Sequence, residues 1–600
     1  MVEFDASRSW VILSTGGGPA GTAASCLARG IASLRERTKT PGGLPAVLDA
    51  ERAEVGDATP LIVLNRDTDS GQTGESSQTD GFAWRAGESR IELHGDTDRG
   101  LLYASLDFLE ALGIRRLFPG ADGVSWPRSG PASSGERGAA AARFTLARSA
   151  AHLRPRFARR GLAMAPLMEG REALEWIEWA GWNRLDTLLL ELAPGVSRTR
   201  NLDTLVRAAR RFGMEVEVGG RLLSPLLPRS DFLLHPDRFR MASGRRRADG
   251  NFCPTNPETI ERVRSRAAEF FRAWPEVSVF HLWPEKGYSP FPSPWCSCPS
   301  CRAFSPLEQE TIATNAVADV LEAERPGARL SFLSSPEFQA SSVVKPRPAV
   351  FPLIEEPSVS PSFVTPSAPE GTRALVRFLD YAACDSVLPP LGDGIARELE
   401  LLEKAGIASV YCRVSAGRLP GLPTANGWAF ARLCWDRLDP ALDSWTKERA
   451  ARAAPLLPEG RREAGAAGLR LSLDLRSRAF AMAAARDFPA ARALQEEAAR
   501  AAFDALRGLG RTDGEAFCFE VDLERRYLAF AEARAAYRAA VRAADGTAGG
   551  RREAARAAAA VRAAWKRWSS WRGAQDGRSR LPRATRRKAR ASIRKSGPSD

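Results

Sequence analysis

A chain of 600 residues is too long for one compact core, so we expect about two to four domains. Apolar residues make up 44% of the sequence and charged residues 26%, which is ordinary for a folded globular protein. Crossing a membrane takes about eighteen consecutive apolar residues, and the sequence has no such stretch. The first residues, MVEFDASRSWVIL, lack the basic start and long apolar centre of a signal peptide. We therefore expect a cytoplasmic protein that does not span a membrane.

The net charge of +14 is concentrated near the C-terminal end. Residues 577–600 contain nine Lys or Arg and one acidic residue, which together contribute +8 of that total. The rest of the chain is only mildly basic, so we expect a solvated basic tail rather than a specific nucleic-acid surface. The nine cysteines are scattered apart from one cluster, a pattern that does not fit a disulfide scaffold.

The N-terminal part of the sequence alternates short apolar strands with helices, as in a small α/β domain. A hairpin is the clearest element, because FAWR and RIEL flank a turn at 86–88. An apolar stripe predicts an amphipathic helix at 98–112. The other expected elements are strands at 10–14 and 61–65 and a helix at 23–37. We assign this domain to residues 1–127 and a linker rich in Gly, Ala and Ser to 128–150.

Residues 151–445 alternate strands and helices regularly, which predicts a TIM-type (β/α)8 barrel. The eight expected strands are 160–164, 186–192, 215–218, 277–283, 329–333, 349–354, 386–388 and 409–414. The helices expected between them are 171–180, 202–212, 257–273, 307–324 and 394–405. No helix is evident between the fifth and sixth strands. Ala, Arg, Glu and Leu at helical spacing then predict an α-helical domain at 446–576, before the basic tail at 577–600.

Gly16, Gly18 and Gly21 form a GxGxxG pattern between the first strand and the first helix. In dinucleotide-binding proteins such glycines let a pyrophosphate approach the helix, and the next strand ends in an acid that binds the ribose. Glu36 lies near that position, but the alternating charges of IASLRERT do not suit a central strand. We interpret the pattern as a strand-to-helix turn and expect no cofactor. A flavin- or dinucleotide-binding oxidoreductase is the lesser alternative.

The stretch VSVFHLWPEKGYSPFPSPWCSCPSC, residues 277–301, joins a buried strand to an unusual loop. Its apolar, β-branched and aromatic start predicts the fourth barrel strand, and Glu285 follows the carboxyl end of that strand. Active sites of such barrels lie at this face, so Glu285 is the leading candidate for a catalytic acid. A surface acid in a loop is the competing interpretation.

The N-terminal domain resembles the domain that precedes the catalytic barrel in β-hexosaminidases and α-glucuronidases. The resemblance rests on LARGIASLRERT, LPAV, LIVLN and the long hairpin-and-helix segment at 80–120. Other segments resemble a bacterial family with the same arrangement, domain of unknown function 4838: GWNRLDTLL, LLHPDRFRMASGRRR, NFCPTNPET, WCSCPSC and ANGWAFARLCWD. The resemblance covers residues 10–443 and implies a carbohydrate-active barrel, a glycosidase, with a carbohydrate ligand.

The resemblance fails at two positions of this sequence. Hexosaminidases carry adjacent Asp and Glu residues at the end of strand four, where the Glu is the acid and the Asp orients the acetamido group. Here the two positions are Pro284 and Glu285, which argues against substrate-assisted hexosaminidase chemistry. Related family members also carry a histidine after a Gly-Gly pair at strand three, where this chain has Arg221.

Glycoside cleavage needs a proton donor and a second carboxylate that faces it across the barrel mouth. Glu191 at the end of strand two, and Glu355 or Glu356 after strand six, are the candidates beside Glu285. A sugar ring stacks on aromatic side chains, and a guanidinium binds a carboxylate such as a uronate with two hydrogen bonds. Residues of these two kinds near strand ends are the substrate-binding candidates: Arg221, Trp283, Tyr288, Trp295, Tyr381, Tyr411 and Arg413. For each aromatic residue, core packing is the competing interpretation.

Cys296, Cys298 and Cys301 form the pattern C-x-C-x-x-C, which is one ligand short of a tetrahedral zinc site. Cys253, in NFCPTN, and His281 are the candidates for a fourth ligand. We expect structural thiols or a local disulfide here rather than zinc.

These observations favour a glycoside hydrolase that acts on a glycan or a uronate-containing sugar, with carboxylate acid/base catalysis led by Glu285. The alternative is a catalytically inactive barrel that binds glycans, because Pro284 and Arg221 stand where related proteins carry catalytic side chains.

Overall fold

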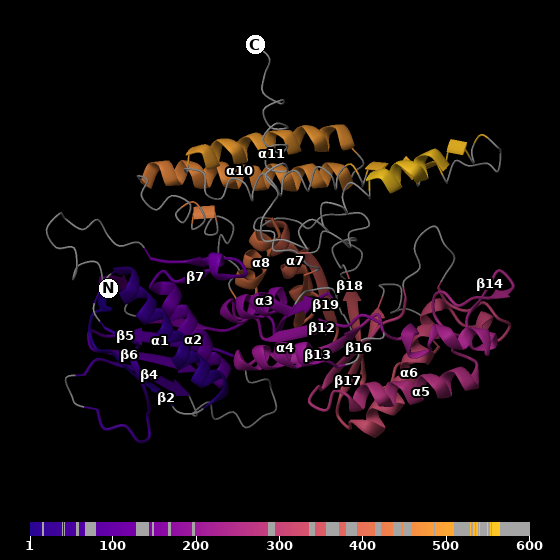
Figure 1. The fold of residues 1–600 in the computed structure, drawn as a ribbon, viewed down its shortest axis with the longest axis horizontal. Helices are drawn as coiled ribbons and strands as arrows, with labels where there is room; N and C mark the ends of the chain where they lie inside the picture. Colours follow the sequence, from indigo (N-terminus) through magenta and orange to yellow (C-terminus); the bar gives the residue numbers. More distant parts are fainter. Residues whose placement is uncertain are drawn as a thin grey trace, which may run out of the picture.

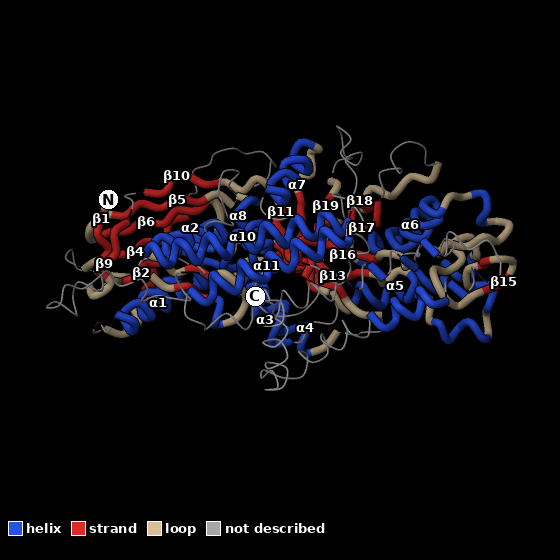
Figure 2. Tube along the Cα trace, turned by 90° about the horizontal axis from the view of Figure 1, so that it is seen from above, coloured by secondary structure: helices blue, strands red, loops and turns tan. Residues whose placement is uncertain are grey.

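The fold of this chain combines a mixed sheet, a closed barrel and a pair of long helices (Figure 1). The sheet and the barrel lie side by side along the longest axis of the molecule (Figures 1 and 2). The computed structural model describes residues 1–14, 17–38, 40, 42–55, 59–66, 80–127, 143–146, 149–165, 170–194, 198–285, 294–334, 343–355, 371–379, 393–414, 422–435, 446–447, 450, 459–484 and 487–508, with scattered residues from 529 to 564. The mixed α/β class expected from the sequence is confirmed, while the domain boundaries stay predictions.

The N-terminal sheet has six strands in the order β10-β5-β6-β4-β2-β3. In that order the strands are Ser149–Leu153, Phe82–Ala86, Arg90–Gly95, Leu61–Arg66, Val11–Ser14 and Ala46–Asp49. The run from β6 to β3 is parallel, and β5 adds to it as the antiparallel partner of β6. The predicted hairpin is confirmed, with the Gly87 N–H donating to the Arg90 carbonyl at 2.7 Å. Three short antiparallel pairs lie outside this sheet: β1 (Val2–Asp5) with β9 (Arg143–Leu146), β7 (Arg115–Arg116) with β8 (Val124–Ser125), and β14 (Met241–Ala242) with β15 (Arg245–Arg246).

Two helices pack against each other beside this sheet, α1 (Gly18–Thr38) and α2 (Asp98–Ala111). The side chain of Thr97 caps α2 by accepting the Gly100 N–H at 2.9 Å. Gly30 of α1 faces Leu109 of α2 so closely that a Cβ there would lie 2.6 Å from the leucine Cδ2. The glycine therefore sets how near the two helices approach.

The barrel closes with eight parallel strands, β11-β12-β13-β16-β17-β18-β19-β20. In that order they are Arg159–Met164, Thr187–Glu191, Glu215–Gly220, Val279–Leu282, Arg329–Ser334, Val350–Glu355, Arg373–Leu379 and Ser409–Val414. Seven of them coincide with predicted strands, but the prediction of strand seven at 386–388 is wrong, because β19 forms that strand and 386–388 lie outside the described residues. The sequence of β19, RALVRFL, is hard to recognise as a barrel strand. It begins with an arginine, Arg373, whose side chain points into the barrel interior.

Helices surround the barrel strands, with α3 and α4 on one side and α7 on the other (Figure 2). The helices are α3 (Gly170–Trp182), α4 (Arg200–Arg211), α5 (Pro257–Arg272), α6 (Pro306–Glu324), α7 (Asp393–Lys404) and α8 (Leu422–Leu433). The five predicted barrel helices are confirmed. Helix α6 begins with a capping box, in which Ser305 and Glu308 each accept the other's backbone N–H.

Polar side chains fill part of the barrel interior, where apolar residues are usual. Glu217 of β13 is 1% exposed and accepts hydrogen bonds from Arg373 Nη1 at 2.7 Å, His281 Nε2 at 2.8 Å and Tyr411 Oη at 2.9 Å. His281 Nδ1 lies 2.6 Å from Ser331 Oγ, which also accepts the indole N–H of Trp283 at 2.9 Å. This buried network ties strands β13, β16, β17, β19 and β20 together.

The charges of this network follow from burial and pairing. Burial opposes the charge of Glu217, but Arg373 and His281 outweigh it and lower the Glu217 pKa to about 2. Burial also lowers the pKa of His281, so the imidazole is neutral at pH 7. A neutral ring that donates from Nε2 to Glu217 has an acceptor at Nδ1, and Ser331 supplies the matching hydroxyl hydrogen. With His281 neutral, the one negative charge of the network, on Glu217, faces Arg373 at 2.7 Å and Arg159 at 3.9 Å.

Buried ion pairs join the N-terminal sheet to the barrel. Arg160 of β11 is fully buried and lies 3.1 Å from Asp80 and 2.8 Å from Asp186. Arg184 reaches Asp107 of α2 at 2.7 Å, close to where Phe82 and the α2 core meet the barrel. Because these charges are desolvated, each one depends on its partner across the contact.

Two long helices follow the barrel, α10 (Glu459–Ala484) and α11 (Phe488–Gly508), and both lie across the top of the view in Figure 1. They pack through small residues: a Cβ at Gly468 would lie 2.7 Å from that of Ala505, and Ser472 donates to the Ala498 carbonyl at 2.8 Å. Within the described part of the chain, no helix is long and apolar enough to cross a bilayer.

Candidate active site

Charged side chains gather where the barrel strands end. Glu191 ends β12, Glu355 ends β18, and Arg413 is the penultimate residue of β20. Arg221 follows β13 directly, and Glu285 comes three residues after β16. Strands two, three, four, six and eight of the barrel thus each bring one charged residue to the carboxyl-terminal face, where active sites of this fold lie.

Glu191 and Arg413 form a two-pronged ion pair across the closure of the barrel. Arg413 Nε donates to Glu191 Oε1 at 2.6 Å, and Nη2 donates to Oε2 at 2.7 Å. The Glu191 side chain is 5% exposed and that of Arg413 is 18% exposed. The fork of the guanidinium matches both carboxylate oxygens, which is the strongest geometry for such a pair.

The electrostatics of Glu191 link it to Glu355. Burial is the main cause of a raised pKa at Glu191, and Arg413 opposes it. The negative charge of Glu355 raises this pKa further, whereas Arg221 lowers it. Arg413, Glu355 and Arg221 therefore all influence the charge state of Glu191.

Arg221 joins strand six to the loop after strand four. Its Nη2 donates to Glu355 Oε2 at 2.8 Å, and its Nη1 donates to the Pro284 carbonyl at 3.0 Å. The Glu355 side chain is 6% exposed, while that of Arg221 is 33% exposed. The arginine thus presents part of its guanidinium to solvent at the mouth.

The backbone at Glu285 is fixed more firmly than its side chain. Its N–H donates to Asn251 Oδ1 at 2.9 Å and to Ser224 Oγ at 3.2 Å, and Asn251 Nδ2 donates back to its carbonyl at 3.3 Å. The carboxylate is 41% exposed and lies 3.8 Å from Arg229. The backbone of Glu285 is thus held by three hydrogen bonds, while its carboxylate is partly exposed beside Arg229.

The described aromatic candidates lie in two different places. Trp283 and Tyr411 are buried in the barrel interior, as parts of the network around Glu217. Trp295 is 6% exposed and packs with the main core. Tyr288 and Tyr381 lie outside the described residues, as does Glu356. The three described aromatic residues are therefore buried, in line with the core-packing interpretation.

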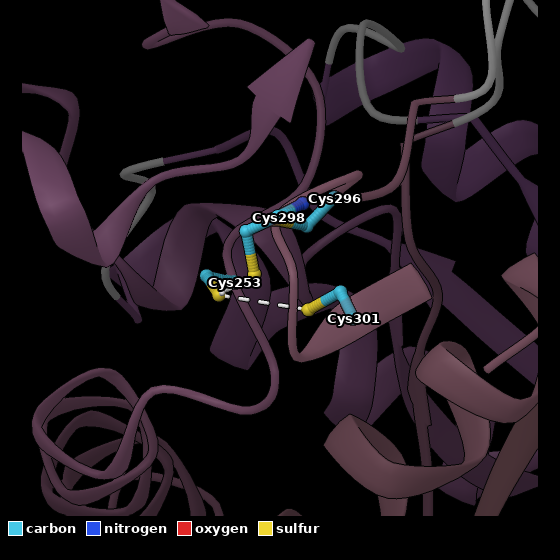
Figure 3. Close-up of side chains that lie close together, drawn as sticks. All are labelled: Cys253, Cys296, Cys298 and Cys301. Atoms are coloured by element: carbon cyan, nitrogen blue, oxygen red, sulfur yellow. Dashed lines mark hydrogen bonds between the residues drawn. The ribbon is translucent and has the colours of Figure 1, made fainter. Parts of the chain in front are cut away.

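The cysteines predicted as a possible metal set come together in the structure. Cys253, Cys296, Cys298 and Cys301 are all buried, and their sulfur atoms lie within 4.8 Å of one another (Figure 3). His281, the other candidate for a fourth ligand, lies inside the barrel instead.

Of the glycine pattern near the N-terminus, Gly18 and Gly21 belong to α1, the helix that follows β2, while Gly16 lies outside the described residues. Glu36, however, belongs to α1 itself, and the next strand, β3, is exposed along its length. Counted from β2, the third strand of this unit is β4, and it pairs with the edge of β2 opposite to β3. This order differs from that of a dinucleotide-binding unit, whose first three strands run 3-2-1.

The sequence did not predict several residues that contact Glu285, among them Arg229, Ser224 and Asn251. They are polar residues in an irregular loop, whose contacts no periodicity foretells. Glu217 offered a partial signal, because it alternates with Val216 and Val218 in a strand and so lies on the opposite face of that strand from the two valines.

Removal of one member of the Glu191–Arg413 pair tests how much it stabilises the mouth. Arg413→Met is expected to lower the free energy of unfolding by about 1.5–3 kcal/mol, because a nearly buried carboxylate loses two charged hydrogen bonds. Urea unfolding measures this, with Arg397→Met on the exposed face of α7 as the matched control. Adding Glu191→Gln to Arg413→Met should cost less than the sum of the two single changes. Equal stability of Arg413→Met and wild type would contradict the pairing.

Comparisons with known proteins agree with this architecture. No family model matches the sequence, and no curated protein does so either. Among solved structures, a GH115 4-O-methyl-α-glucuronidase with specificity for decorated arabinogalactans has a TM-score of 0.55 at 12% identity, covering 95% of this chain and 77% of its own. A GH138 enzyme targeting pectin rhamnogalacturonan II has a TM-score of 0.54 at 10% identity, covering 94% and 74%. A GH20 chitobiase from Flavobacterium johnsoniae has a TM-score of 0.50 at 12% identity, covering 98% and 93%.

At such low identities these similarities define the fold alone. The chain has a glycosidase-like fold, and the sequence-based resemblance to glycosidases agrees with it at that level. The likeness extends over most of the chain, from the N-terminal sheet through the barrel and beyond.

Proposed function

We propose that this protein is a glycoside hydrolase that acts on a glycan or a uronate-containing sugar at the mouth of the barrel. The observation that carries the proposal is the placement of Glu191, Glu285 and Glu355 at the ends of strands two, four and six of one closed barrel. Glycosidases need two carboxyl groups on opposite sides of the scissile bond, and strand ends of a barrel can supply them. The glycosidase-like fold and the resemblance to domain of unknown function 4838 support this class.

Glu285 serves as the general acid in this proposal. Its carboxyl group is half open to solvent, so it can reach a glycosidic oxygen, while Asn251 and Ser224 hold its backbone. Rigid support of a catalytic group keeps it in the reacting geometry and avoids the entropic cost of ordering it during the reaction. Arg221 adds to this support through the Pro284 carbonyl.

Glu355 or Glu191 supplies the second carboxylate. Both are nearly buried and both hold a guanidinium, which keeps Glu355 oriented toward the same side of the mouth as Arg221. A uronate would find a partner in Arg221, since a third of that side chain is exposed and a guanidinium has five N–H donors. An acidic sugar is therefore the substrate class that the charges favour.

A panel of aryl glycosides and aryl glucuronides tests the proposal. We expect release of the phenol from at least one member, with a preference for a uronate over the matching neutral sugar. The preference should weaken in Arg221→Gln, which removes the charge and keeps a polar side chain. The proposal that this protein is an enzyme would be rejected if the wild type binds oligosaccharides measurably but turns over no member of the panel.

A glycan-binding barrel without catalysis is the second candidate. The two-pronged pairing of Glu191 with Arg413 favours it, because a carboxylate engaged by both oxygens resembles a structural ion pair. Pro284 before Glu285 points the same way, since the sequence resemblance places an acid there. The panel above separates the two candidates when it is combined with calorimetry on unmodified oligosaccharides.

A further inference from the structure

The four buried cysteines come from two loops at the barrel mouth. Cys253 belongs to the segment between β13 and α5, residues 221–256, which we call loop three. Cys296, Cys298 and Cys301 belong to the segment between β16 and α6, residues 283–305, which we call loop four. Figure 3 shows the sulfur atoms of Cys253, Cys298 and Cys301 turned toward one another.

The spacing of the sulfur atoms matches a metal site better than a disulfide. Cys253 Sγ lies 3.6 Å from Cys301 Sγ and 3.8 Å from Cys298 Sγ. In a tetrahedron with zinc–sulfur bonds of about 2.3 Å, neighbouring sulfur atoms lie about 3.8 Å apart. A disulfide requires about 2.05 Å between its sulfur atoms.

We propose that Cys253, Cys296, Cys298 and Cys301 bind one zinc ion as four thiolates and that this centre staples loop three to loop four. Four protein ligands leave no position for water or substrate, which is the arrangement of structural zinc sites. The sulfur-only ligand set selects zinc over magnesium or calcium, which prefer oxygen. All four side chains are at most 5% exposed, so the centre is closed to solvent.

The surroundings of the cluster suit a negatively charged metal–thiolate centre. A zinc ion with four thiolates carries a net charge of −2, which needs donors and a cation nearby. The backbone N–H groups of Met241 and Cys298 point to Cys296 Sγ at 3.2 and 3.5 Å, and Arg246 Nη1 lies 3.9 Å from the same sulfur. The Thr255 hydroxyl lies 3.1 Å from Cys301 Sγ.

The peptide backbone that carries the thiols is also held in place. Gln309 of α6 is buried, and its amide accepts the Cys296 N–H at 3.0 Å and donates to the carbonyls of Cys296 and Cys301 at 3.1 and 3.3 Å. Met241 is the apolar side chain that packs against this cluster, which is separate from the main core. The metal would therefore link two backbone segments whose thiols are already held near one another.

The zinc centre is linked to Glu285 through backbone and side-chain hydrogen bonds. The role inferred from this link rests on the proposed function. Asn251 stands two residues before Cys253 and binds both backbone groups of Glu285. The Asn251 N–H in turn donates to the Pro294 carbonyl at 2.9 Å, two residues before Cys296. The zinc centre thus acts as a positioning device for the proposed acid, without contact with substrate.

Metal analysis of the purified full-length protein tests the site itself. We expect about one zinc ion per chain after extensive dialysis, by inductively coupled plasma mass spectrometry, and we expect a mercurial, which binds thiolates, to release this zinc. Cys301→Ser should lose most of this zinc, whereas Cys26→Ser, which alters a buried cysteine of α1, should retain it. Wild-type protein that lacks zinc and does not take it up after reduction would overturn the proposal, and so would disulfides among the four residues by mass spectrometry.

A spectroscopic measurement keeps the test decisive if the cysteine variants fail to fold. Wild-type protein reconstituted with cobalt(II) should show the ligand-field and thiolate charge-transfer bands of a tetrahedral sulfur site, and zinc should abolish them. An octahedral cobalt spectrum would reject the assignment. These readouts contain no sugar, so a protein that binds zinc and hydrolyses nothing would refute the proposed function alone.

Discussion

Glu285→Gln is expected to lower kcat/KM for a glycoside with a poor leaving group by about 100- to 10,000-fold, the usual contribution of a general acid. Glutamine keeps the size of the side chain and cannot donate the proton that the leaving oxygen needs. The backbone contacts with Asn251 and Ser224 do not involve the carboxyl group, so the fold should be preserved. Thermal unfolding of both proteins checks that expectation.

The leaving group provides a sharper readout of the same variant. A nitrophenolate departs with little protonation, so Glu285→Gln should lose much less activity on a nitrophenyl glycoside than on an alkyl glycoside. Glu322→Gln, on the exposed face of α6, is the matched control and should behave as wild type on both. Equal losses on both substrates would assign Glu285 a role other than proton donation.

Glu217→Gln is expected to lower the free energy of unfolding at pH 7 by about 3–5 kcal/mol, since it leaves Arg373 buried without its negative partner. The side chain is 1% exposed, so water cannot replace the lost interactions. Urea unfolding monitored by circular dichroism measures the change. Glu215→Gln is a control on the same strand, and its half-exposed pair with Arg159 should contribute about 0–1 kcal/mol.

The stability difference between wild type and Glu217→Gln should also depend on pH. The Glu217 pKa is lowered from 4.5 to about 2 in the folded protein, because Arg373 and His281 outweigh the effect of burial. The resulting stabilisation, about 3 kcal/mol, is complete above pH 4.5 and is lost as the pH falls from 4.5 to 2. The gap between the two proteins should therefore narrow across that window. A gap that is constant from pH 7 to pH 2 would contradict the ionised state of Glu217.

Much of the fold could be predicted from the sequence, because buried faces of strands and helices require apolar residues at regular spacing. The apolar runs of seven barrel strands and the stripes of five barrel helices identified those elements. The charged residues at the mouth could be anticipated for a related reason: Glu191 and Glu355 each end an apolar run, and strand ends of a barrel share one face.

The features that stayed hidden are those in which charge is buried. The sequence pattern predicts no strand at β19, which begins with Arg373, an arginine that pairs with Glu217 inside the barrel. Each of the two partners is unfavourable alone in a core, and their compatibility depends on a contact 156 residues apart in the sequence. Such pairs form only when the barrel closes and brings distant strands together, so local sequence patterns do not predict them.

The fourth member of the cysteine cluster shows the same limit. In the sequence, Cys253 and His281 are both candidates for the fourth ligand, and the expectation is structural thiols or a local disulfide rather than zinc. The hairpin of β14 (Met241–Ala242) and β15 (Arg245–Arg246) is what brings loop three against loop four, through the contact of Met241 with Cys296. The path of loop three, which is irregular, therefore decides that Cys253 rather than His281 joins the other three cysteines.

The most direct test of the account is a crystal structure of Glu285→Gln with an oligosaccharide that wild type hydrolyses. We predict the sugar at the carboxyl-terminal face of the barrel, with its glycosidic oxygen about 3 Å from the residue 285 amide and its ring beside Glu355 and Arg221. A sugar bound elsewhere, with the amide of residue 285 facing solvent, would contradict the proposed active site.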